Sequence, residues 1–477
     1  MSNAASPTAA AKTDLPKYVP WMYMFYQFLY SFGIVMALNY VVFFVTEYAG
    51  MTPTLMASFL SVARLLDLFV SMFSGAIIQR QKRMRPWLLG VPLVGGTGAI
   101  LVFLNPPIPL AAKTVLVFVG YCCIHFPMNF ITVAQNTLIM KVAGPNPANR
   151  LSITSMVLRG SSAARIAYSA ATLPMIMFLM RNGLPGYLIM TIAYFILWLI
   201  GAFVLYFGTS MFEPKEDPAS EQSKAVVTAA PKGPSILQMY IAAFKNRPIM
   251  ILVICGIITG AAGQVLSQGA IYYYRYSIGG PNWQNWQAIA GTVAGVVALG
   301  TAIIGPLIGK KIGKRNSFLI MYVWCAICEL INMFFMDGNV MLYIVVSSVM
   351  ALGTSISGSW GINLYLDAAE VQYHETGVDN RPFMMSINNF PTKTGFIFSG
   401  PLVAFMLNSS DYKVIDNVGQ LPNTQTYVYV WMGIIVACYV AAFIIFLFGY
   451  KIDERYAAEA AASNAEKAAA AKAAAEA

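Results

Sequence analysis

The sequence has few charged residues. Aspartate, glutamate, lysine and arginine make up 10% of the 477 residues, whereas hydrophobic residues make up 58% and the mean hydropathy is +0.63. A soluble domain carries about 25% charged residues, so a soluble fold of this length would lack the polar surface that it needs. In hydrocarbon, an α-helix satisfies its own backbone hydrogen bonds and presents apolar side chains to lipid. The composition therefore predicts an all-α membrane protein.

Residue patterns typical of enzymes and metal sites are also scarce. The two histidines, His125 and His374, are far apart, and no GxSxG, HExxH or glycine-rich phosphate loop occurs. All six cysteines lie in apolar segments, and the CxxC formed by Cys325 and Cys328 has no second pair. We therefore expect no enzymatic activity, no metal and no cofactor. Because the net charge of +10 is not gathered in one basic domain, no nucleic-acid partner is expected either.

Twelve apolar runs are long enough to cross a bilayer, which takes about 20 residues. In chain order they cover residues 20–46, 54–79, 86–104, 112–141, 151–180, 184–208, 248–276, 286–311, 316–336, 339–367, 382–408 and 425–449. A polar segment rich in proline and serine divides them into six and six, and this composition is typical of a linker. The last part of that segment, residues 236–244, is apolar enough to form an elbow helix on the membrane surface.

The runs and the polar segments between them predict five parts. In chain order these are a cytoplasmic N-terminal segment, a six-helix bundle, a cytoplasmic linker, a second six-helix bundle and an alanine-rich cytoplasmic tail, at residues 1–19, 20–209, 210–247, 248–450 and 451–477. The tail is expected to be a solvated helix or to lack order.

Basic residues gather in the short loops after the second and the eighth run. The first of these loops contains Arg80, Arg83 and Arg85, and the second extends from Lys310 to Arg315. Short cytoplasmic loops are rich in lysine and arginine, so both termini are expected in the cytoplasm. The matching loops also indicate an internal repeat, which in transporters places the substrate site between the halves near the midplane. A channel is less well supported, because the sequence shows no repeated charged or carbonyl ring.

Several charged residues lie within the predicted runs, where each costs about 2.5–3.5 kcal/mol unless it has a partner or water. Arg64 and Asp67 are three residues apart and share a helix face, so one interpretation is a structural ion pair. The alternative is that Asp67 binds a proton or a sodium ion as the coupling carboxylate, with Lys393 or Arg159 as its partner. The sequence leaves this choice open. The other candidates are Arg165, Arg275, Glu329, Asp367 and Glu370.

Polar residues also recur at helical spacing on several runs. They are Gln27 and Ser31, then Asn129, Thr132 and Asn136, then Gln264, Gln268 and Tyr272, then Ser355, Ser359 and Asn363, and finally Asn389 with Lys393. Polar side chains hold membrane helices together by hydrogen bonds, so each stripe has a structural interpretation. Stripes on helices of both halves together favour a hydrated central cavity that binds a hydroxylated solute.

Three stretches together resemble one family. They are Val62-Ala63-Arg64-Leu65-Leu66-Asp67 with the basic loop that ends at Trp87, then Ala270-Ile271-Tyr272-Tyr273-Tyr274, and then AAEVQYHETGVDNR at 368–381 followed by Lys393. They resemble the glycoside–pentoside–hexuronide:cation symporters, the melibiose-permease group of the major facilitator superfamily. The resemblance spans both halves. It implies the major facilitator fold and transport of a solute together with a cation.

The residues expected to carry this function come from the stripes, the intramembrane charges and the resemblance. Asp67 is the expected cation-coupling residue. The expected substrate-binding residues are Arg159, Lys393, Asn129, Thr132, Asn136, Gln264, Gln268, Tyr272, Ser359 and Asn389. The expected gate and loop residues are Arg64, Arg80, Arg83, Arg85 and Glu370.

The sequence departs from this family chiefly in its acidic residues. Family members usually carry a second aspartate four residues after the first, where this chain has Ser71. The acidic positions that contact sugar in melibiose-type members fall on Ser31 and Thr132, whereas Arg159 is retained. Fewer carboxylates beside Arg159 and Lys393 favour an anionic solute, such as a hexuronide or another organic acid, because guanidinium pairs bidentately with carboxylate. Alternatively, internal carboxylates neutralise both cations and the solute is neutral.

The predicted function is secondary active transport of a small organic solute by alternating access, coupled to a cation. One carboxylate on the second run favours a proton, because sodium prefers several oxygen ligands. The alternatives are a neutral-sugar uniporter and a transporter-derived sensor or scaffold without coupling. The resemblance implies a multi-pass protein of a bacterial cytoplasmic membrane, and we expect it to function as a monomer.

Overall fold

The apolar runs of the sequence form long helices. The computed structural model describes residues 15–79, 81, 83–144, 147–213, 244–336, 338–358, 361–377, 390–415 and 418–476. Within these ranges, nine helical segments are long and apolar enough to cross a membrane. The remaining three of the twelve predicted runs overlap helices α11, α13 and α16, whose bounds follow.

The N-terminal half contains eight helical segments up to residue 208. They are α1 (Tyr18–Val35), the π-helix η1 (Met36–Tyr40), α2 (Val41–Glu47), α3 (Pro53–Gln79), α4 (Arg85–Phe103), α5 (Leu110–Ala143), α6 (Pro147–Arg181) and α7 (Gly186–Gly208). A short 3-10 helix, η2 (Ser210–Phe212), follows. The segments α1, η1 and α2 follow one another directly and together form the first predicted span.

The C-terminal half repeats this pattern. Its elements are α10 (Arg247–Tyr272), the π-helix η3 (Tyr273–Ile278), α11 (Trp283–Ile312), α12 (Lys314–Phe335), α13 (Val340–Gly358), α14 (Gly361–Thr376), α16 (Phe390–Asn408), β1 (Lys413–Ile415), β2 (Val418–Gln420), α17 (Thr424–Gly449) and α18 (Glu454–Glu476). The predicted tenth run corresponds to α13 followed by α14. The strands β1 and β2 form an antiparallel hairpin that the sequence analysis did not predict.

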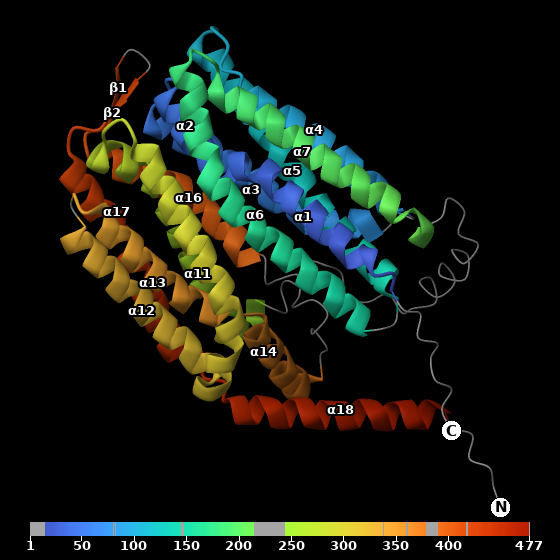
Figure 1. Ribbon diagram of the computed structural model, residues 1–477. Helices are drawn as coiled ribbons and strands as arrows, with labels where there is room; N and C mark the ends of the chain where they lie inside the picture. Colours follow the sequence, from blue (N-terminus) through green and yellow to red (C-terminus); the bar gives the residue numbers. More distant parts are fainter. Residues whose placement is uncertain are drawn as a thin grey trace, which may run out of the picture.

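Two predictions concern segments at the edges of these bundles. The predicted elbow helix and most of the linker lie outside the described residues, since 214–243 are not described. The alanine-rich tail forms α18, which crosses the end of the molecule opposite the β1–β2 hairpin (Figure 1) and packs against α14. Asn464 of α18 is 1% exposed, and its amide donates to the Glu370 carboxylate at 2.8 Å. The tail is therefore a docked helix, because this face is covered by α14.

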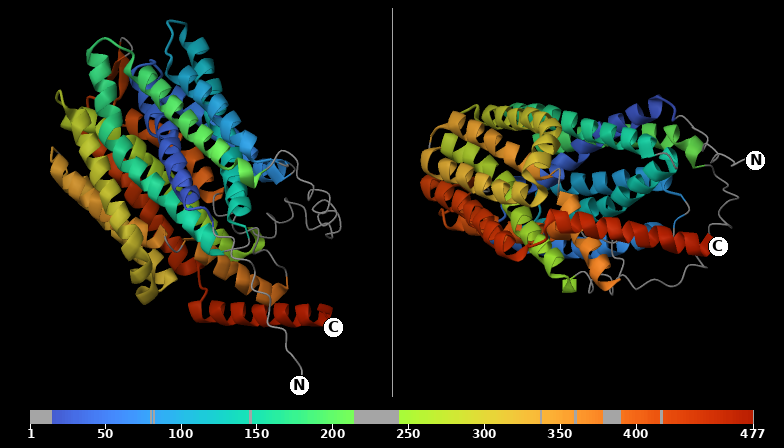
Figure 2. Two further views of the ribbon diagram at one scale, coloured as in Figure 1. Left: turned by 45° about the vertical axis from the view of Figure 1, so that its right-hand side comes forward. Right: turned by 90° about the horizontal axis from the view of Figure 1, so that it is seen from below.

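The two bundles meet along two helix pairs, α3 with α16 and α6 with α11 (Figures 1 and 2). Small residues allow the second pair to approach closely. A Cβ atom at Gly291 of α11 would lie 2.7 Å from the Cβ of Ser169, and one at Gly295 would lie 2.9 Å from Ile166. Close packing at small residues is a main source of helix association in lipid. These glycines therefore hold the halves together beside the space described below.

Each half fixes the start of one helix with a carboxylate from the end of that half. In the N-terminal half, Glu213 accepts the backbone N–H groups of Met84 and Arg85, each at 2.9 Å, and forms an ion pair with Lys141 at 2.6 Å. The Arg85 guanidinium donates to the Tyr206 carbonyl at 2.8 Å. A carboxylate at a helix N-terminus is favourable because the first N–H groups lack partners within the helix.

The C-terminal half uses equivalent groups. Glu454 accepts the backbone N–H of Arg315 at 3.1 Å, and the Arg315 guanidinium donates to the Tyr450 carbonyl at 2.9 Å. The two basic loops therefore bind within their own halves, at the end of the molecule that we call the basic end, defined by Arg85 and Arg315. The opposite end carries β1 and β2, and we call it the hairpin end.

We expect Glu213→Gln to lower the free energy of unfolding by about 1–3 kcal/mol, because two N–H groups and an ammonium lose a charged acceptor. Burial alone would raise the pKa of Glu213, but the hydrogen bonds from Lys141, Arg85 and Met84 hold that pKa below its ordinary value of 4.5. The stabilisation is therefore present above that value and is lost as the pH falls through the folded-state pKa.

Thermal unfolding in detergent, measured from neutral to acidic pH, checks this expectation. The matched control is Glu459→Gln on α18, where an exposed carboxylate lies 3.6 Å from Arg455, and pairs of this kind contribute little. An unchanged melting temperature for Glu213→Gln at neutral pH contradicts the prediction.

Candidate functional site

A cavity of about 770 Å³ lies between the two bundles. Its walls come from the first span and α6 of the N-terminal half and from α10, η3, α11, α13 and α17 of the C-terminal half. Hydroxyl and amide groups recur around it, among them Gln27, Ser31, Asn39, Ser169, Ser267, Gln287 and Ser347. The cavity therefore offers many hydrogen-bond donors and acceptors, and its volume is in the usual range for a small-molecule site, about 300–1,000 Å³.

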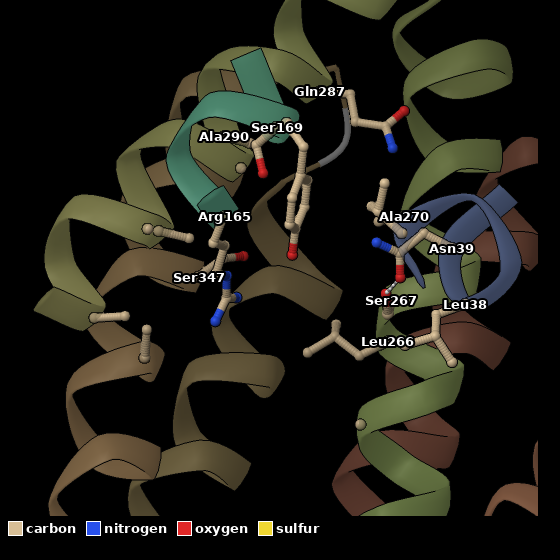
Figure 3. Close-up of a pocket in the computed structure, with 18 of the residues that line it drawn as sticks. Leu38, Asn39, Arg165, Ser169, Leu266, Ser267, Ala270, Gln287, Ala290 and Ser347 are labelled. Carbon is tan, nitrogen blue, oxygen red and sulfur yellow. Dashed lines mark hydrogen bonds between the residues drawn. The ribbon is translucent and has the colours of Figure 1, made fainter. Parts of the chain in front are cut away.

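Arg165 is the one charged side chain among the described residues that line this cavity. It extends from α6 and is exposed, and it takes part in none of the ion pairs within the described ranges. Figure 3 shows Arg165 and Asn39 on opposite walls, with Asn39 3.5 Å from the hydroxyl of Ser267. Because the described part of the lining contains no carboxylate, the positive charge of this guanidinium has no counterion there.

A second polar cluster joins α3, α5 and α16. The Lys393 ammonium lies 3.3 Å from Asp67 Oδ2, and the Asn129 amide donates to Asp67 Oδ1 at 2.7 Å. Lys393 also donates to the Asn129 side-chain oxygen. Asp67 is 4% exposed and belongs to the N-terminal half, whereas Lys393 belongs to the C-terminal half. The sequence left Lys393 and Arg159 open as partners of Asp67, and in the structure Lys393 forms the ion pair.

Arg64 does not form the predicted ion pair with Asp67 within the described ranges. Its guanidinium lies 5.2 Å from the ring centroids of both Tyr121 and Phe396 and 3.5 Å from His125 Nδ1. A guanidinium over aromatic rings is stabilised by the negative ring face. Arg64 is thus held by aromatic groups beside the Asp67–Lys393 pair.

The structure disperses the other residues predicted to bind substrate. Arg159 is exposed on α6, and its guanidinium contacts the sulfur of Met156 at 3.6 Å. Thr132 and Asn136 are exposed on α5. Gln268 donates to Gln264 at 3.3 Å. Like Arg159, Thr132 and Asn136, these two glutamines are absent from the cavity lining.

The remaining predicted residues have other surroundings. Tyr272 is fully buried and shares a hydrogen bond of 2.6 Å with Thr46. Arg83 is exposed in the loop after α3, and Glu370 binds α18 as described above. Ser359, Asn389 and Arg80 lie outside the described residues.

A set of contacts that we call the clasp closes the hairpin end. Glu47, at the end of the first span, is 1% exposed and lies 3.1 Å from the Arg275 guanidinium of η3. Its carboxylate also accepts the hydroxyls of Tyr276 at 2.7 Å and Tyr412 at 2.9 Å. Burial raises the pKa of Tyr412, so this hydroxyl keeps its proton and remains a donor. The carbonyl oxygen of Gly419 in β2 also lies 2.7 Å from the Tyr276 hydroxyl, as a second acceptor for its one proton.

The polar contacts between the halves lie in the middle of the molecule and at the hairpin end. Besides the clasp and the Asp67–Lys393 pair, Asn408 contacts Thr54 at 3.3 Å and Arg181 donates to the Pro281 carbonyl. The structure therefore has a closed hairpin end.

The sequence profile of the family described as MFS/sugar transport protein matches residues 22–454. The chain belongs to this family. The transporter is therefore a multi-pass membrane protein, and both the resemblance to the cation symporters and the predicted major facilitator fold are confirmed.

Individual relatives are distant. The isoprimeverose transporter of Lactiplantibacillus pentosus is 23% identical, over 95% of this chain and 93% of that protein. The putative 2,3-dihydroxypropane-1-sulfonate exporter of Salmonella typhimurium is 22% identical, over 87% of this chain and 88% of that protein. The crystal structure of a D-xylose-proton symporter matches with a TM-score of 0.61 and 14% identity, over 90% of this chain and 96% of that chain. The structural match shows the shared fold.

Sequence reasoning identified some of the cavity residues but did not select Arg165 for the site. Gln27 and Ser31 were recognised as a polar stripe, and Arg165 as an intramembrane charge. The sequence does contain a pattern that could have identified Arg165 as a cavity residue. Ser161, Arg165 and Ser169 are spaced four residues apart, which places their side chains on one face of α6.

We expect Arg275→Gln to open the hairpin end, because the buried Glu47 carboxylate loses its cation. A loss of about 1.4 kcal/mol changes the ratio of open to closed molecules tenfold. Spin labels on cysteines introduced at Ala111 and Lys413, which are exposed at this end on opposite halves, report the change as a longer distance in pulsed electron paramagnetic resonance. The background protein has its six native cysteines replaced, and Arg455→Gln on α18 is the control. Identical distance distributions with and without Arg275 contradict the role of the clasp.

Proposed function

We propose that this transporter moves an anionic sugar derivative by alternating access and couples it to protons. The observation that carries the proposal is Arg165, an unpaired guanidinium in a cavity whose described lining contains no carboxylate. An anionic group on the solute supplies the missing partner, because guanidinium binds carboxylate, sulfonate and phosphate oxygens through parallel hydrogen bonds. The name of the Salmonella relative, a sulfonate exporter, supports a solute of this charge.

The rest of the cavity suits a hydroxylated molecule. Asn39, Ser267 and Gln287 face the space from three different elements, and six tyrosines contribute to the wall among aliphatic and small residues. A few polar groups placed among apolar and aromatic side chains are typical of small-molecule sites, where they fix orientation and specificity. Arg165 would hold the charged end of the solute and these amides and hydroxyls its sugar hydroxyls.

Asp67 is the residue through which we propose that protons are coupled. Its ion pair with Lys393 bridges the halves along α3 and α16. Protonation of Asp67 would remove the attraction to Lys393 and weaken this bridge. Both Asp67 oxygens already accept hydrogen bonds from Lys393 and Asn129, which leaves little room for the several oxygen ligands of a sodium ion. A proton needs one titrating group.

Orientation follows from the positive-inside rule. The basic end would lie in the cytoplasm with both termini, and the clasp would close the outer face. We propose a bacterial cytoplasmic membrane, a functional monomer, and transport without enzymatic activity, cofactor or nucleic-acid partner.

Uptake into proteoliposomes under an inward proton gradient tests the proposal. The panel contains D-glucuronate, 2,3-dihydroxypropane-1-sulfonate and neutral methyl glycosides. We expect one anionic solute to accumulate, a protonophore to abolish the accumulation, and Arg165→Gln to lower uptake about ten- to hundredfold, the effect of losing one charge-assisted contact.

Two further variants on α6 sharpen this test. Arg150→Gln, an exposed position outside the cavity lining, is the matched control and should transport normally. Arg159→Gln compares the residue predicted from the family resemblance with Arg165. If neutral glycosides alone are taken up, or if uptake requires Arg159 and not Arg165, the anionic-cavity assignment is wrong. Equilibration that ignores the proton gradient would mean a uniporter.

A further inference from the structure

Glu329 is a carboxyl group sealed inside the C-terminal bundle. It lies on α12 and is 0% exposed, and it takes part in none of the ion pairs within the described ranges. An ionised carboxylate without a partner is among the most costly groups to bury, and such groups usually neutralise instead. The mechanism proposed above makes no use of this residue.

Within the described part of the chain, the groups near Glu329 are uncharged. On α12 itself they are Cys328, the preceding residue, and Cys325, one turn away. From the neighbouring helices α13 and α17, the titratable groups within electrostatic reach are the hydroxyls of Tyr343 and Tyr439. Helix α12 also contacts α14 and α11. On α14, the Asp367 carboxylate is already paired with Lys314 at 2.7 Å. The described part of α11 places no charged group against Glu329. No cation therefore balances a charge on Glu329 within the described residues.

The Glu329 and Asn332 side chains together have one hydrogen-bond donor too few for their oxygen acceptors. The Asn332 amide nitrogen donates to Glu329 Oε2 at 3.0 Å. The two remaining oxygens, Glu329 Oε1 and Asn332 Oδ1, are both buried and have no partner. Buried acceptors without partners are rare in proteins. A proton on Oε1 supplies the missing donor, because the carboxylic acid O–H can donate to Asn332 Oδ1 and close a paired acid–amide arrangement.

We propose that Glu329 is a proton-binding site in the C-terminal bundle, separate from the Asp67–Lys393 pair and occupied at neutral pH. The site lies behind the cavity wall, since Tyr343 and Tyr439 are within electrostatic reach of the Glu329 carboxyl group and line the cavity. Release of the proton would place a negative charge behind this wall and oppose an anion bound at Arg165. Proton binding and anion binding are then linked, each favouring the other to the same extent. This second statement rests on the proposed function, whereas the proton site itself does not.

Infrared spectroscopy of the full-length protein in lipid tests the site without a solute. A protonated carboxyl group in an apolar environment has a carbonyl stretch distinct from that of a carboxylate. We expect this band at neutral pH in the wild type, its loss in Glu329→Gln, and its retention in Asp67→Asn and in the exposed variant Glu375→Gln. The glutamine amide can donate to Asn332 Oδ1 as the acid does, so this variant should fold.

The variant Asn332→Ala provides an independent check. It removes the acceptor of the acid O–H, so the band should move to higher frequency while the proton stays bound. A wild-type spectrum without the band, or a band that persists unchanged in Glu329→Gln and Asn332→Ala, overturns the proton site.

The linkage is measured separately by uptake of D-glucuronate and 2,3-dihydroxypropane-1-sulfonate across a range of pH. The wild type should lose uptake as the pH rises, by on the order of tenfold, and Glu329→Gln should lose less because its side chain cannot ionise. Equal pH profiles overturn the linkage. If the wild type takes up neither anion, the proposed function fails, and the infrared result still decides the proton site.

Discussion

A charge at bilayer depth is costly, about 2.5–3.5 kcal/mol on insertion scales, and this constraint arranges the polar residues of the transporter. The charge of Asp67 is neutralised by its ion pair with Lys393 of the other half. In the clasp at the hairpin end, the charge of Glu47 is neutralised in the same way by Arg275. Arg165 and Glu329 have no counterion within the described ranges. Arg165 faces the cavity, where a solute can pair with it. Glu329 is sealed from solvent, and a proton is the one cation that needs no further space.

The same constraint links the cavity to the closure of the hairpin end. The first span contains the π-helix η1 and the seventh span ends in the π-helix η3, and π-helical turns occur frequently at functional sites. Asn39 and Tyr40 of η1 and Tyr274 of η3 line the cavity, and the next residue, Arg275, belongs to the clasp. The cavity wall and the clasp are therefore joined by a direct backbone connection. Breaking the clasp and the central ion pair together would separate the halves along α3 and α16.

The sequence predicted the helices far better than it predicted the contacts of the site. Long apolar runs and basic loops are local signals, so each of the twelve runs overlaps a helix of the described residues. The choice between Arg159 and Arg165 depends on the rotation of α6, which is set by packing against α1 and α11. Six residues turn a helix through about 240° beyond one full turn at 3.6 residues per turn, so the two arginines face different surroundings. The partner of Asp67 likewise depended on which helix of the other half lies beside α3, a tertiary contact without a local signal.

Proton movement driven by the solute tests the central claim most directly. Proteoliposomes that enclose a pH-sensitive dye receive an anionic solute of the panel outside, with the membrane voltage clamped at zero and no initial pH gradient. We predict that the interior acidifies as the solute enters, and that the Asp67→Asn variant produces no acidification. Entry of the solute into wild-type vesicles at constant internal pH would contradict this prediction, since the transporter would then carry the anion without a proton.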